Sequence, residues 1–393
     1  MNAPLRSAET VTFGCRLNAV ESQELAQAHA SAREAVVVVN TCAVTSEATR
    51  QARQAIRRLH RERPDAEIVV AGCAARLDPK SFAGMDGVTR VVAEHAPNRA
   101  RAGVEGTRGL LAVQNGCDHR CTFCIIPFGR GASRSAPPLE AIAQARALVA
   151  DGKKEIVLTG VDLTSYGVDL GEGWTLGRLV RELLRELPAL ERLRLSSVDC
   201  IEVDDDLVAA FAEEARLCPH LHLSLQSGDD LILKRMKRRH CRAAAIDLCR
   251  RLRRERADIV FGADFIVGFP TETEDMFAAT LDLVDACGLT HLHVFPFSPR
   301  PGTPAARMPQ VAPPIAKARA ARLRERGDAA LRRLLDAQVG RSLRLLTERS
   351  GTARAADFTL AQTPGVDAGR MIDALCTGYD GRALTTRVTA LDR

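Results

Sequence analysis

The sequence holds two sets of cysteines whose spacing could support chemistry. In the stretch GCDHRCTFC, Cys117, Cys121 and Cys124 follow a CxxxCxxC spacing within a short polar segment, so their sulfurs can converge as thiolates. We refer to them as the loop cysteines. A structural zinc site is closed by four ligands, and a fully ligated iron–sulfur cube also takes four cysteines. Three thiolates on a 4Fe-4S cube would leave one iron open for catalysis. The alternative is three buried or zinc-binding cysteines.

A second set of cysteines each follows a short apolar segment that is typical of a buried strand. Strands are predicted at residues 10–13, 36–39 and 67–71, and they end just before Cys15, Cys42 and Cys73. We refer to these as the strand-end cysteines. In a parallel sheet the carboxyl ends of the strands lie at one edge, where helix N-termini follow them. The topology therefore predicts a second three-thiolate site, although cysteines at strand ends are, taken alone, more often core residues.

Length and composition are typical of a globular protein with two or three domains. The chain has 393 residues, of which 46% are hydrophobic and 26% charged. A charged-then-apolar leader is missing, and so is any apolar run of about 18 residues, so we expect a cytoplasmic protein without a membrane partner. Twelve cysteines in such a chain favour metal or redox chemistry over disulfides. The net charge of +6 permits a nucleic-acid partner without requiring one.

Strand and helix patterns alternate regularly through the middle of the chain. Six strands are predicted, at residues 110–113, 155–159, 192–196, 220–225, 258–267 and 289–297. Because the closed form of such a barrel has eight strand–helix units, six units predict an incomplete barrel, with its chemistry at the carboxyl ends of the strands. The fold class is therefore α/β, with a small parallel-sheet domain preceding a partial (β/α)6 barrel. The densely basic stretch 234–256 fits either solvated helix faces or phosphate contacts.

The last part of the chain changes character again. Prolines between residues 299 and 314 mark a connector, and a helix is predicted over 315–338. Short alternating segments after Gly340 predict a small β-domain, although residues 352–373 fit strand patterning poorly. We therefore expect three domains, at residues 1–106, 107–337 and 338–393.

The wider stretch NGCDHRCTFCIIPFGRGASRS resembles the cluster loop of radical S-adenosylmethionine (SAM) enzymes and, among them, the methylthiotransferase family. TFGCRLN, NTCAVT and AGCAAR resemble the N-terminal pattern of that family. The resemblance implies that the loop cysteines bind a catalytic 4Fe-4S cluster with SAM, and that the strand-end cysteines bind an auxiliary 4Fe-4S cluster. It further implies two SAM-dependent steps: methylation of a cluster-bound sulfur, and radical cleavage of SAM to activate a carbon that no base could deprotonate.

The resemblance extends to the strand ends and to the C-terminus. LTGVDLTSYG and LHLSLQSGDD resemble strand-end motifs of the family, which implies that Gly160, Gln226 and Ser227 lie near SAM. Small and amide-bearing residues suit a site where the protein backbone approaches a ligand closely. The alternative is that a glycine or serine at a strand end serves only to form a turn. The region after residue 338 resembles the TRAM module, a small β-barrel that contacts RNA.

Within the family, one branch fits best. GCRLNAVES, IIPFGRGASRS and HVFPFSPRPGTPA resemble the branch that methylthiolates threonylcarbamoyladenosine beside the anticodon of tRNA, at C2 of the adenine. The partners this implies are tRNA, SAM, an electron donor and a sulfur source, the last two unidentified. Asp199 and Asp162 depart from the pattern of the branch, which has a longer carboxylate and an asparagine there, so their effect on substrate contact is open.

Three other functions remain as alternatives. One is the neighbouring branch that acts on isopentenyl-adenosine in tRNA. Another modifies an aspartate of a ribosomal protein, but its first cysteine motif carries proline and lysine where this chain has Arg16 and Leu17. The third is a non-enzymatic iron–sulfur electron carrier. The barrel and the two three-cysteine sites disfavour a carrier, since a carrier has no need for open irons.

Overall fold

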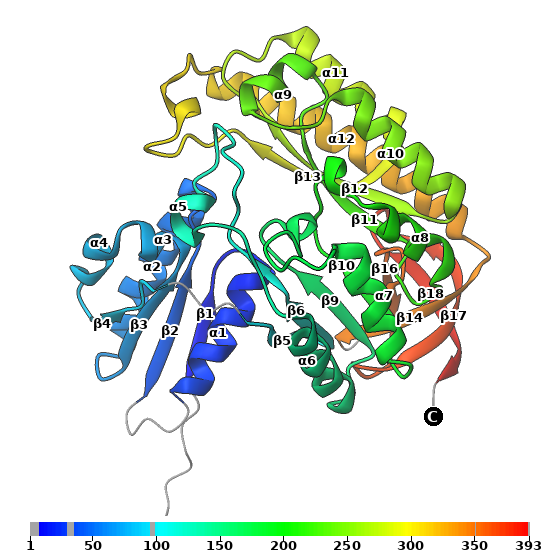
Figure 1. Ribbon diagram of the computed structural model, residues 1–393, viewed down its shortest axis with the longest axis horizontal. Coiled ribbons are helices and arrows are strands. Elements are labelled where there is room, and N and C mark those ends of the chain that lie inside the picture. The colour runs from blue at the N-terminus through cyan, green and yellow to red at the C-terminus, as the bar shows by residue number, and fades with distance from the viewer. Residues whose placement is uncertain (1–7, 30–34, 95–98, 350, 392–393) are drawn as a thin grey trace, which may run out of the picture.

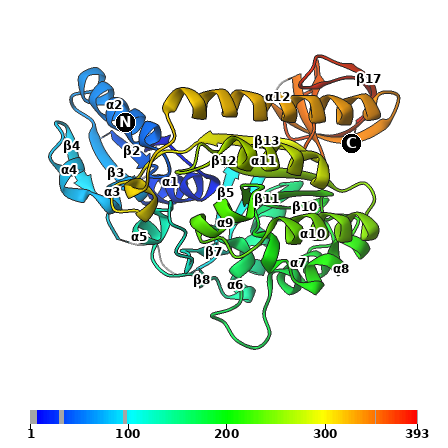
Figure 2. The same ribbon diagram turned by 90° about the horizontal axis from the view of Figure 1, so that it is seen from above.

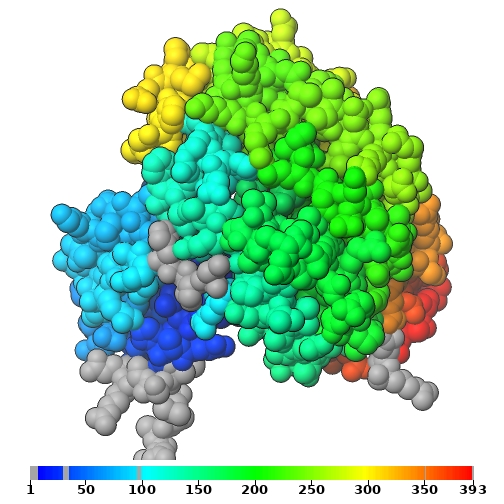
Figure 3. Space-filling model, in the orientation of Figure 1, coloured from blue at the N-terminus to red at the C-terminus, as the bar shows by residue number. Residues whose placement is uncertain are grey.

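A computed structural model describes residues 8–29, 35–94, 99–349 and 351–391. An N-terminal α/β unit, a central partial barrel and a small C-terminal barrel follow one another along the chain (Figure 1). In Figure 3, where the chain is drawn as filled atoms, the N-terminal and central units abut. No helix among these residues is long and apolar enough to cross a membrane.

The N-terminal unit is a four-stranded parallel sheet in the order β1-β2-β3-β4. Its elements are β1 (Glu9–Thr12), α1 (Arg16–Ala28), β2 (Val36–Thr41), α2 (Ser46–Glu62), β3 (Glu67–Gly72), α3 (Cys73–Leu77), α4 (Pro79–Ala83) and β4 (Val88–Val91). Strand β2 is buried along its whole length because it is a central strand covered on both faces. Helix α2 begins at a side-chain cap, because the Thr45 side chain accepts a hydrogen bond from the backbone of Ala48.

The central unit carries six parallel strands that curve into an open barrel. Its strands are β5 (Arg101–Glu105), β6 (Arg108–Ala112), β7 (Gln114–Asn115), β8 (Arg134–Ser135), β9 (Glu155–Thr159), β10 (Arg192–Leu195), β11 (His220–Gln226), β12 (Val260–Val267) and β13 (Leu289–Pro296). Its helices are α5 (Ile126–Arg130), α6 (Pro138–Ala150), η1 (Leu163–Ser165), α7 (Leu176–Glu186), η2 (Cys200–Glu202), α8 (Asp205–Glu213), α9 (Asp230–Met236), α10 (Arg242–Glu255), α11 (Glu274–Cys287) and η3 (Pro304–Arg307).

The six barrel strands are β6, β9, β10, β11, β12 and β13. Strands β10, β9 and β6 form one parallel sheet, and β11, β12 and β13 form another. Isolated bridges from Leu193 to Leu217 and from Val198 to Leu223 connect the two sheets. The largest apolar core of the described residues fills the space between these strands and the outer helices. The α/β fold class and the partial barrel are therefore as the sequence predicts.

The predicted boundary between residues 106 and 107 falls inside a hairpin. Strand β5 pairs antiparallel with β6 across a turn at Gly106 and so extends the sheet of the central unit. Helix α1 of the N-terminal unit packs against β5. The two units therefore share a strand at their junction, which composition alone could not indicate.

Helix α12 (Pro313–Gln338) connects the barrel to the C-terminal unit. Figure 2 shows α12 running alongside β13 and α11 toward β17. The C-terminal unit is a closed barrel of β14 (Ser342–Arg349), β15 (Gly351–Ala355), β16 (Leu360–Thr363), β17 (Met371–Tyr379) and β18 (Leu384–Leu391). Strands β15 and β16 lie largely in residues 352–373, the stretch that fits strand patterning poorly. Their inward positions Ala353, Ala355 and Ala361 are buried but small, which mutes the alternation in hydrophobicity.

Candidate functional site

The strand-end cysteines gather at the carboxyl edge of the N-terminal sheet. Cys15 precedes α1, Cys42 follows β2, and Cys73 is the first residue of α3. The side-chain oxygen of Asn18 lies 3.8 Å from the Cys15 sulfur and 4.0 Å from the Cys73 sulfur. A Cβ added at Gly14 would lie 3.0 Å from the Cys42 sulfur, so all three sulfurs surround the start of α1.

A tight turn of the backbone brings Cys73 to this edge. Gly72 has a φ of +93°, which L side chains rarely adopt. A Cβ there would lie 2.2 Å from the side-chain oxygen of Asn40 and 2.4 Å from the carbonyl oxygen of Thr41. Only glycine therefore lets β3 turn directly into α3 and present the Cys73 sulfur toward the other two.

The loop cysteines lie between β7 and α5, half-buried, at the mouth of the partial barrel. The Cys117 sulfur is 3.7 Å from Asp162, in the segment after β9. The Cys121 sulfur is 3.8 Å from the Arg238 guanidinium, and the Cys124 sulfur accepts a hydrogen bond of 3.4 Å from the backbone of Ile126. The segment after β9, Arg238 and helix α5 therefore each hold one of the three cysteines in place.

Sulfur spacing distinguishes a cluster from a single ion. A tetrahedral zinc ion with Zn–S bonds of about 2.3 Å would hold its sulfurs ~3.8 Å apart. Among the described residues, no group of three or more side chains whose ligand atoms all lie within 4.8 Å of one another contains two of these cysteines, so neither set of three meets that spacing. Each set is therefore too open for one zinc ion. A cube that offers a separate iron to each thiolate fits the wider spacing.

Burial makes the free thiols weak acids. It raises the pKa of Cys117 to about 12, with the Asp162 carboxylate adding to the effect, and the pKa of Cys124 to about 11. Burial also raises the pKa of Cys42 and Cys73. These side chains would lose their protons as metal binds rather than before, because ligation and deprotonation are coupled.

Arg130, at the end of α5, connects the two cysteine sets. Its buried guanidinium donates to the Cys73 sulfur at 3.1 Å, to Glu21 at 2.9 Å and to Asn115 at 3.1 Å. It also donates to Asn18. The segment that follows the loop cysteines therefore reaches into the strand-end site, and the charge of Glu21 is balanced inside the protein.

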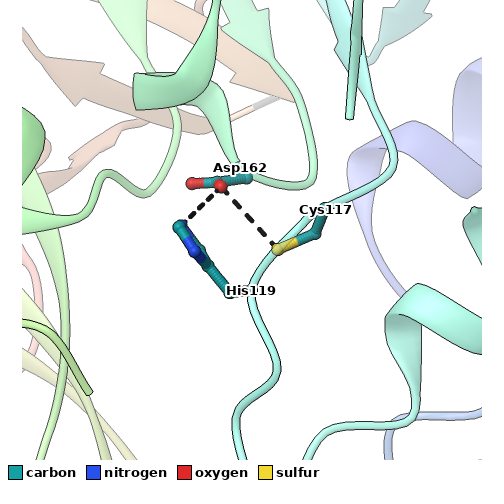
Figure 4. A group of neighbouring side chains, drawn as sticks. All are labelled: Cys117, His119 and Asp162. Carbon is teal, nitrogen blue, oxygen red and sulfur yellow. Dashed lines mark hydrogen bonds and ion pairs between the residues drawn. The ribbon is translucent and has the colours of Figure 1, made fainter. Parts of the chain in front are cut away.

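An ion-paired group flanks Cys117. Nε2 of His119 lies 2.8 Å from Asp162, and Figure 4 shows both side chains beside Cys117. Glu202 lies 3.6 Å from the same ring nitrogen. Hydrogen bonds to Asp162 and then Glu202 raise the pKa of His119 to about 10, so the ring is an imidazolium at neutral pH. Asp162 was noted in the sequence only as a departure from a pattern. In the structure it joins the loop to the end of β9.

Arginines of the basic stretch 234–256 pair with other groups of the protein. Arg238, which is almost fully buried, donates to Asp199 at 2.8 Å and to the carbonyl oxygen of Ser224 at 2.6 Å. Arg239 pairs with Glu202 and contacts His119. Contact with phosphate is therefore not the role of Arg238, which instead positions Asp199 beside Cys121.

The three residues expected near SAM lie at strand ends of the barrel, in different environments. Gly160 follows β9, and a Cβ there would lie 2.8 Å from Oε1 of Gln114. Gln226 ends β11 with a φ of +69°, a strained conformation that is frequent at functional sites. The buried Ser227 hydroxyl accepts a hydrogen bond from the backbone of Asp229 and lies 3.4 Å from Thr280. The Ser227 backbone N–H donates to the carbonyl oxygen of Leu225, which leaves the Ser227 carbonyl for a ligand.

Sequence reasoning missed Gln114. Its Oε1 accepts hydrogen bonds from the backbone of Val161 and Asp162, and its amide nitrogen donates to the carbonyl of Gly116 just before Cys117. One side chain thus ties the cluster loop to the end of β9. No motif marks this glutamine, although Gly160, which makes room for it, was a visible signal.

A partial barrel with three open-spaced cysteines at its mouth defines a radical SAM enzyme. Residues 111–284 match the model of the radical SAM superfamily, and residues 8–93 match a family described as uncharacterized protein family UPF0004. The radical SAM methyltransferase TsrM from Kitasatospora setae has a similar fold, with a TM-score of 0.53, 18% identity, and coverage of 70% of this chain and 67% of that chain.

Curated relatives extend across nearly the whole chain. The threonylcarbamoyladenosine tRNA methylthiotransferase MtaB of Rickettsia prowazekii is 44% identical, over 89% of this chain and 90% of its own length. MtaB of Thermotoga maritima is 35% identical, over 77% of both chains. A tRNA-2-methylthio-N(6)-dimethylallyladenosine synthase of Cereibacter sphaeroides is 37% identical, over 86% of this chain and 87% of its own. The chain belongs to the radical SAM tRNA methylthiotransferase family, whose members use SAM and two 4Fe-4S clusters.

Proposed function

We propose that this enzyme transfers a methylthio group to C2 of the adenine in N6-threonylcarbamoyladenosine next to the anticodon of tRNA. The observation that carries the proposal is the 44% identity to a threonylcarbamoyladenosine tRNA methylthiotransferase over nine tenths of both chains. The substrate carbon carries no acidic proton, so a radical route is the physically reasonable one.

Within this proposal, the loop cysteines hold the catalytic cluster and the strand-end cysteines hold the auxiliary cluster. When bound, the two clusters and SAM supply a radical that removes hydrogen from carbon and a sulfur that can be methylated. The chain itself orients them. Arg130 connects the two cysteine sets, and Gln114 fixes the loop to β9. Arg238 contacts both Asp199 and the Cys121 sulfur.

Gly160, Gln226 and Ser227 line the SAM side of the site in this proposal. Gly160 and Gln226 offer backbone and an amide to SAM, and Ser227 offers its backbone carbonyl, since its hydroxyl and its N–H are used in the turn. The C-terminal barrel, residues 338–393, contacts the tRNA. An electron donor and a sulfur source complete the partners, and the reaction takes place in the cytoplasm, where the tRNA is.

A test is mass spectrometry of tRNA nucleosides from cells that lack this protein. Loss of the methylthio group from threonylcarbamoyladenosine, with the methylthio form of dimethylallyl-adenosine intact, is expected. The reverse pattern would assign the chain to the dimethylallyl branch, which is the second candidate because of the 37% identical relative. Unchanged tRNA with loss of a methylthio group on a ribosomal protein would contradict both.

A further inference from the structure

The inner face of β11, β12 and β13 carries a row of polar and aromatic side chains. Along these strands, alternate residues such as Leu221, Leu223 and Phe265 are fully buried against the outer helices. Because side chains alternate across a strand, the residues between them face the interior of the barrel. These inner residues are His220, His222, Asp264, His291, His293 and Phe295.

Exposure rises along this inner face toward the mouth of the barrel. At the lower end, the ring of Phe358 from the C-terminal barrel stacks on His220 at 4.9 Å and meets the edge of His291 at 5.9 Å. His220 and His222 are buried, whereas the side chain of His293 is 58% exposed and Phe295 is 44% exposed. The interior is therefore closed by Phe358 at the amino ends of the strands. It is open at the carboxyl ends, where the loop cysteines lie.

Three inner residues form one connected group. Nε2 of His222 lies 2.9 Å from Oδ1 of Asp264, and Nδ1 of His293 lies 3.1 Å from the same oxygen. His293 and Asp264 are direct partners across β12 and β13. Gly262 makes the arrangement possible, because a Cβ there would lie 2.5 Å from Nδ1 of His222. We call His222, Asp264 and His293 the inner triad.

The inner triad presents a charged carboxylate and a ring nitrogen to the interior. Burial alone would raise the pKa of Asp264, but hydrogen bonds from His222 and His293 outweigh it and hold that pKa well below its ordinary value. Both hydrogen bonds use Oδ1. In the part of the chain that the structure describes, Oδ2 of Asp264 and Nε2 of His293 make no hydrogen bond. With the Nδ1–H of a neutral His293 ring donated to Asp264, Oδ2 of Asp264 and Nε2 of His293 are two acceptors left for a ligand.

The inner triad lies farther from the mouth of the barrel than the cluster loop does. Phe297, four residues after His293, packs on Phe269 with ring centroids 5.4 Å apart. Phe269 in turn packs on Phe123, which stands between Cys121 and Cys124, at 6.4 Å. At about 3.3 Å per strand residue, His293 lies roughly 13 Å below this aromatic contact. A nucleoside placed under the loop would extend its substituent toward the triad.

We propose that His222, Asp264 and His293 form the binding subsite for the N6 substituent of the target adenosine, and that they select a polar, hydrogen-bonding substituent over a hydrocarbon one. The inference rests on the proposed function and names the residues that decide between its two tRNA branches. A threonylcarbamoyl group offers N–H and hydroxyl donors, which can be accepted by Oδ2 of Asp264 and by Nε2 of His293.

A dimethylallyl group offers no hydrogen bond. If it were seated against the inner triad, it would displace water from the Asp264 carboxylate without replacing any hydrogen bond. A site built to hydrogen-bond its substrate rejects an analogue that lacks those groups, because its own buried polar atoms are then left unpaired. The triad therefore accounts for the choice of substrate by its polarity rather than by its size.

The experiment uses the full-length holoenzyme with both clusters reconstituted without oxygen. An equal mixture of tRNA bearing threonylcarbamoyladenosine and tRNA bearing dimethylallyl-adenosine is the substrate, and both methylthio products are quantified by mass spectrometry. Wild-type enzyme is expected to modify the first tRNA in preference. His293→Phe is expected to lower that rate about ten- to a hundredfold, since one hydrogen bond to a polar substituent is lost. Iron content and SAM cleavage should not change.

Two further variants keep the test specific. His293→Gln retains a side chain that can donate to Asp264 and accept from the substrate, and it is expected to recover most of the activity on threonylcarbamoyladenosine. Asp264→Asn keeps the shape of the side chain and is expected to lower the preference for this substrate even if His293→Phe does not fold. The matched control is His60→Phe on α2, far from the barrel interior, which should behave as wild type.

Three results would overturn the inference. The first is an unchanged substrate preference in His293→Phe and Asp264→Asn. The second is a metal ion beyond those of the clusters, measured by elemental analysis and lost in Asp264→Asn, because two histidines and a carboxylate can also hold a divalent metal. The third is a wild-type enzyme that modifies only the dimethylallyl substrate. That result contradicts the proposed function as well, and it differs from the first because it is visible without any variant.

Discussion

Replacing Arg130 by methionine should strongly destabilise the junction between the two cysteine sets. The Arg130 side chain is 2% exposed and bonds Glu21, Asn115 and the Cys73 sulfur. Removing one partner of a buried ion pair costs roughly 3–5 kcal/mol, because the remaining charge is left buried. Arg76 and Arg101 lie 3.6 and 3.7 Å from Glu21 and retain part of the compensation. We therefore expect a loss near the lower limit, about 3 kcal/mol.

Hydrogen exchange measured by mass spectrometry is the suitable assay. A chain with several structural units does not unfold in one step, so a global free energy of unfolding would be poorly defined. Exchange instead reports the free energy of opening for each segment. The peptides that cover α1 and α5 should exchange faster in Arg130→Met, whereas those from the C-terminal barrel should not change.

Two comparisons make the reasoning refutable. Arg58→Met removes a pair with Glu62 at 3.8 Å in which both side chains are about 60% exposed, and it should cost roughly 0–1 kcal/mol. Adding Glu21→Met to Arg130→Met should not recover the loss, because the buried Arg76 then loses its carboxylate partner and Arg101 keeps only Glu24. If Arg130→Met cost no more than Arg58→Met, the junction would not depend on this ion pair.

Three other predictions concern the clusters and the buried histidine of β13. Cys121→Ala should retain about four of the roughly eight irons per chain that two cubes contain, and loss of all iron would contradict two separate sites. Cys42→Ala should still form 5′-deoxyadenosine from SAM but transfer no methylthio group, so full product would remove the auxiliary site from the reaction. Burial lowers the pKa of His291 to about 3, so protons bind more strongly once β13 opens, and the free energy of opening of this segment should fall as the pH drops below about 6.5. His291→Leu should remove up to about 2 kcal/mol of that loss at pH 5, measured by hydrogen exchange of β13 peptides at each pH.

The main elements follow from the sequence because their signals are local. Helix α2 has its cap at Thr45 and a clear apolar face, so its bounds can be read directly. The meeting of the strand-end cysteines follows from the parallel order of β1, β2 and β3, which places their ends at one edge. Both inferences need only neighbouring residues and a simple rule of topology.

The remaining features depend on contacts between distant residues. Gln114, Asn18 and Glu21 hold the site together through partners that lie 48, 112 and 109 positions away. Gln114 belongs to no motif, and although Asn18 and Glu21 fall within GCRLNAVES, nothing local in that stretch indicates that both contact Arg130. The histidines of β13 showed no role in the sequence, because the partner of His293, Asp264, stands on the preceding strand. The strands of the C-terminal barrel were hidden by small inward residues such as Ala353.

The ring of Phe358 makes the C-terminal barrel part of the catalytic unit. A chain cut after Gln338 would lose the surface that covers His220 and His291, and water would reach the base of the barrel. If the C-terminal barrel contacts tRNA as proposed, inactivity of such a truncated enzyme would combine two effects, weaker binding of RNA and exposure of the barrel interior to water. Substitution of an exposed side chain on β18, such as Arg387, separates them, because it changes the outer surface and leaves the Phe358 contact in place.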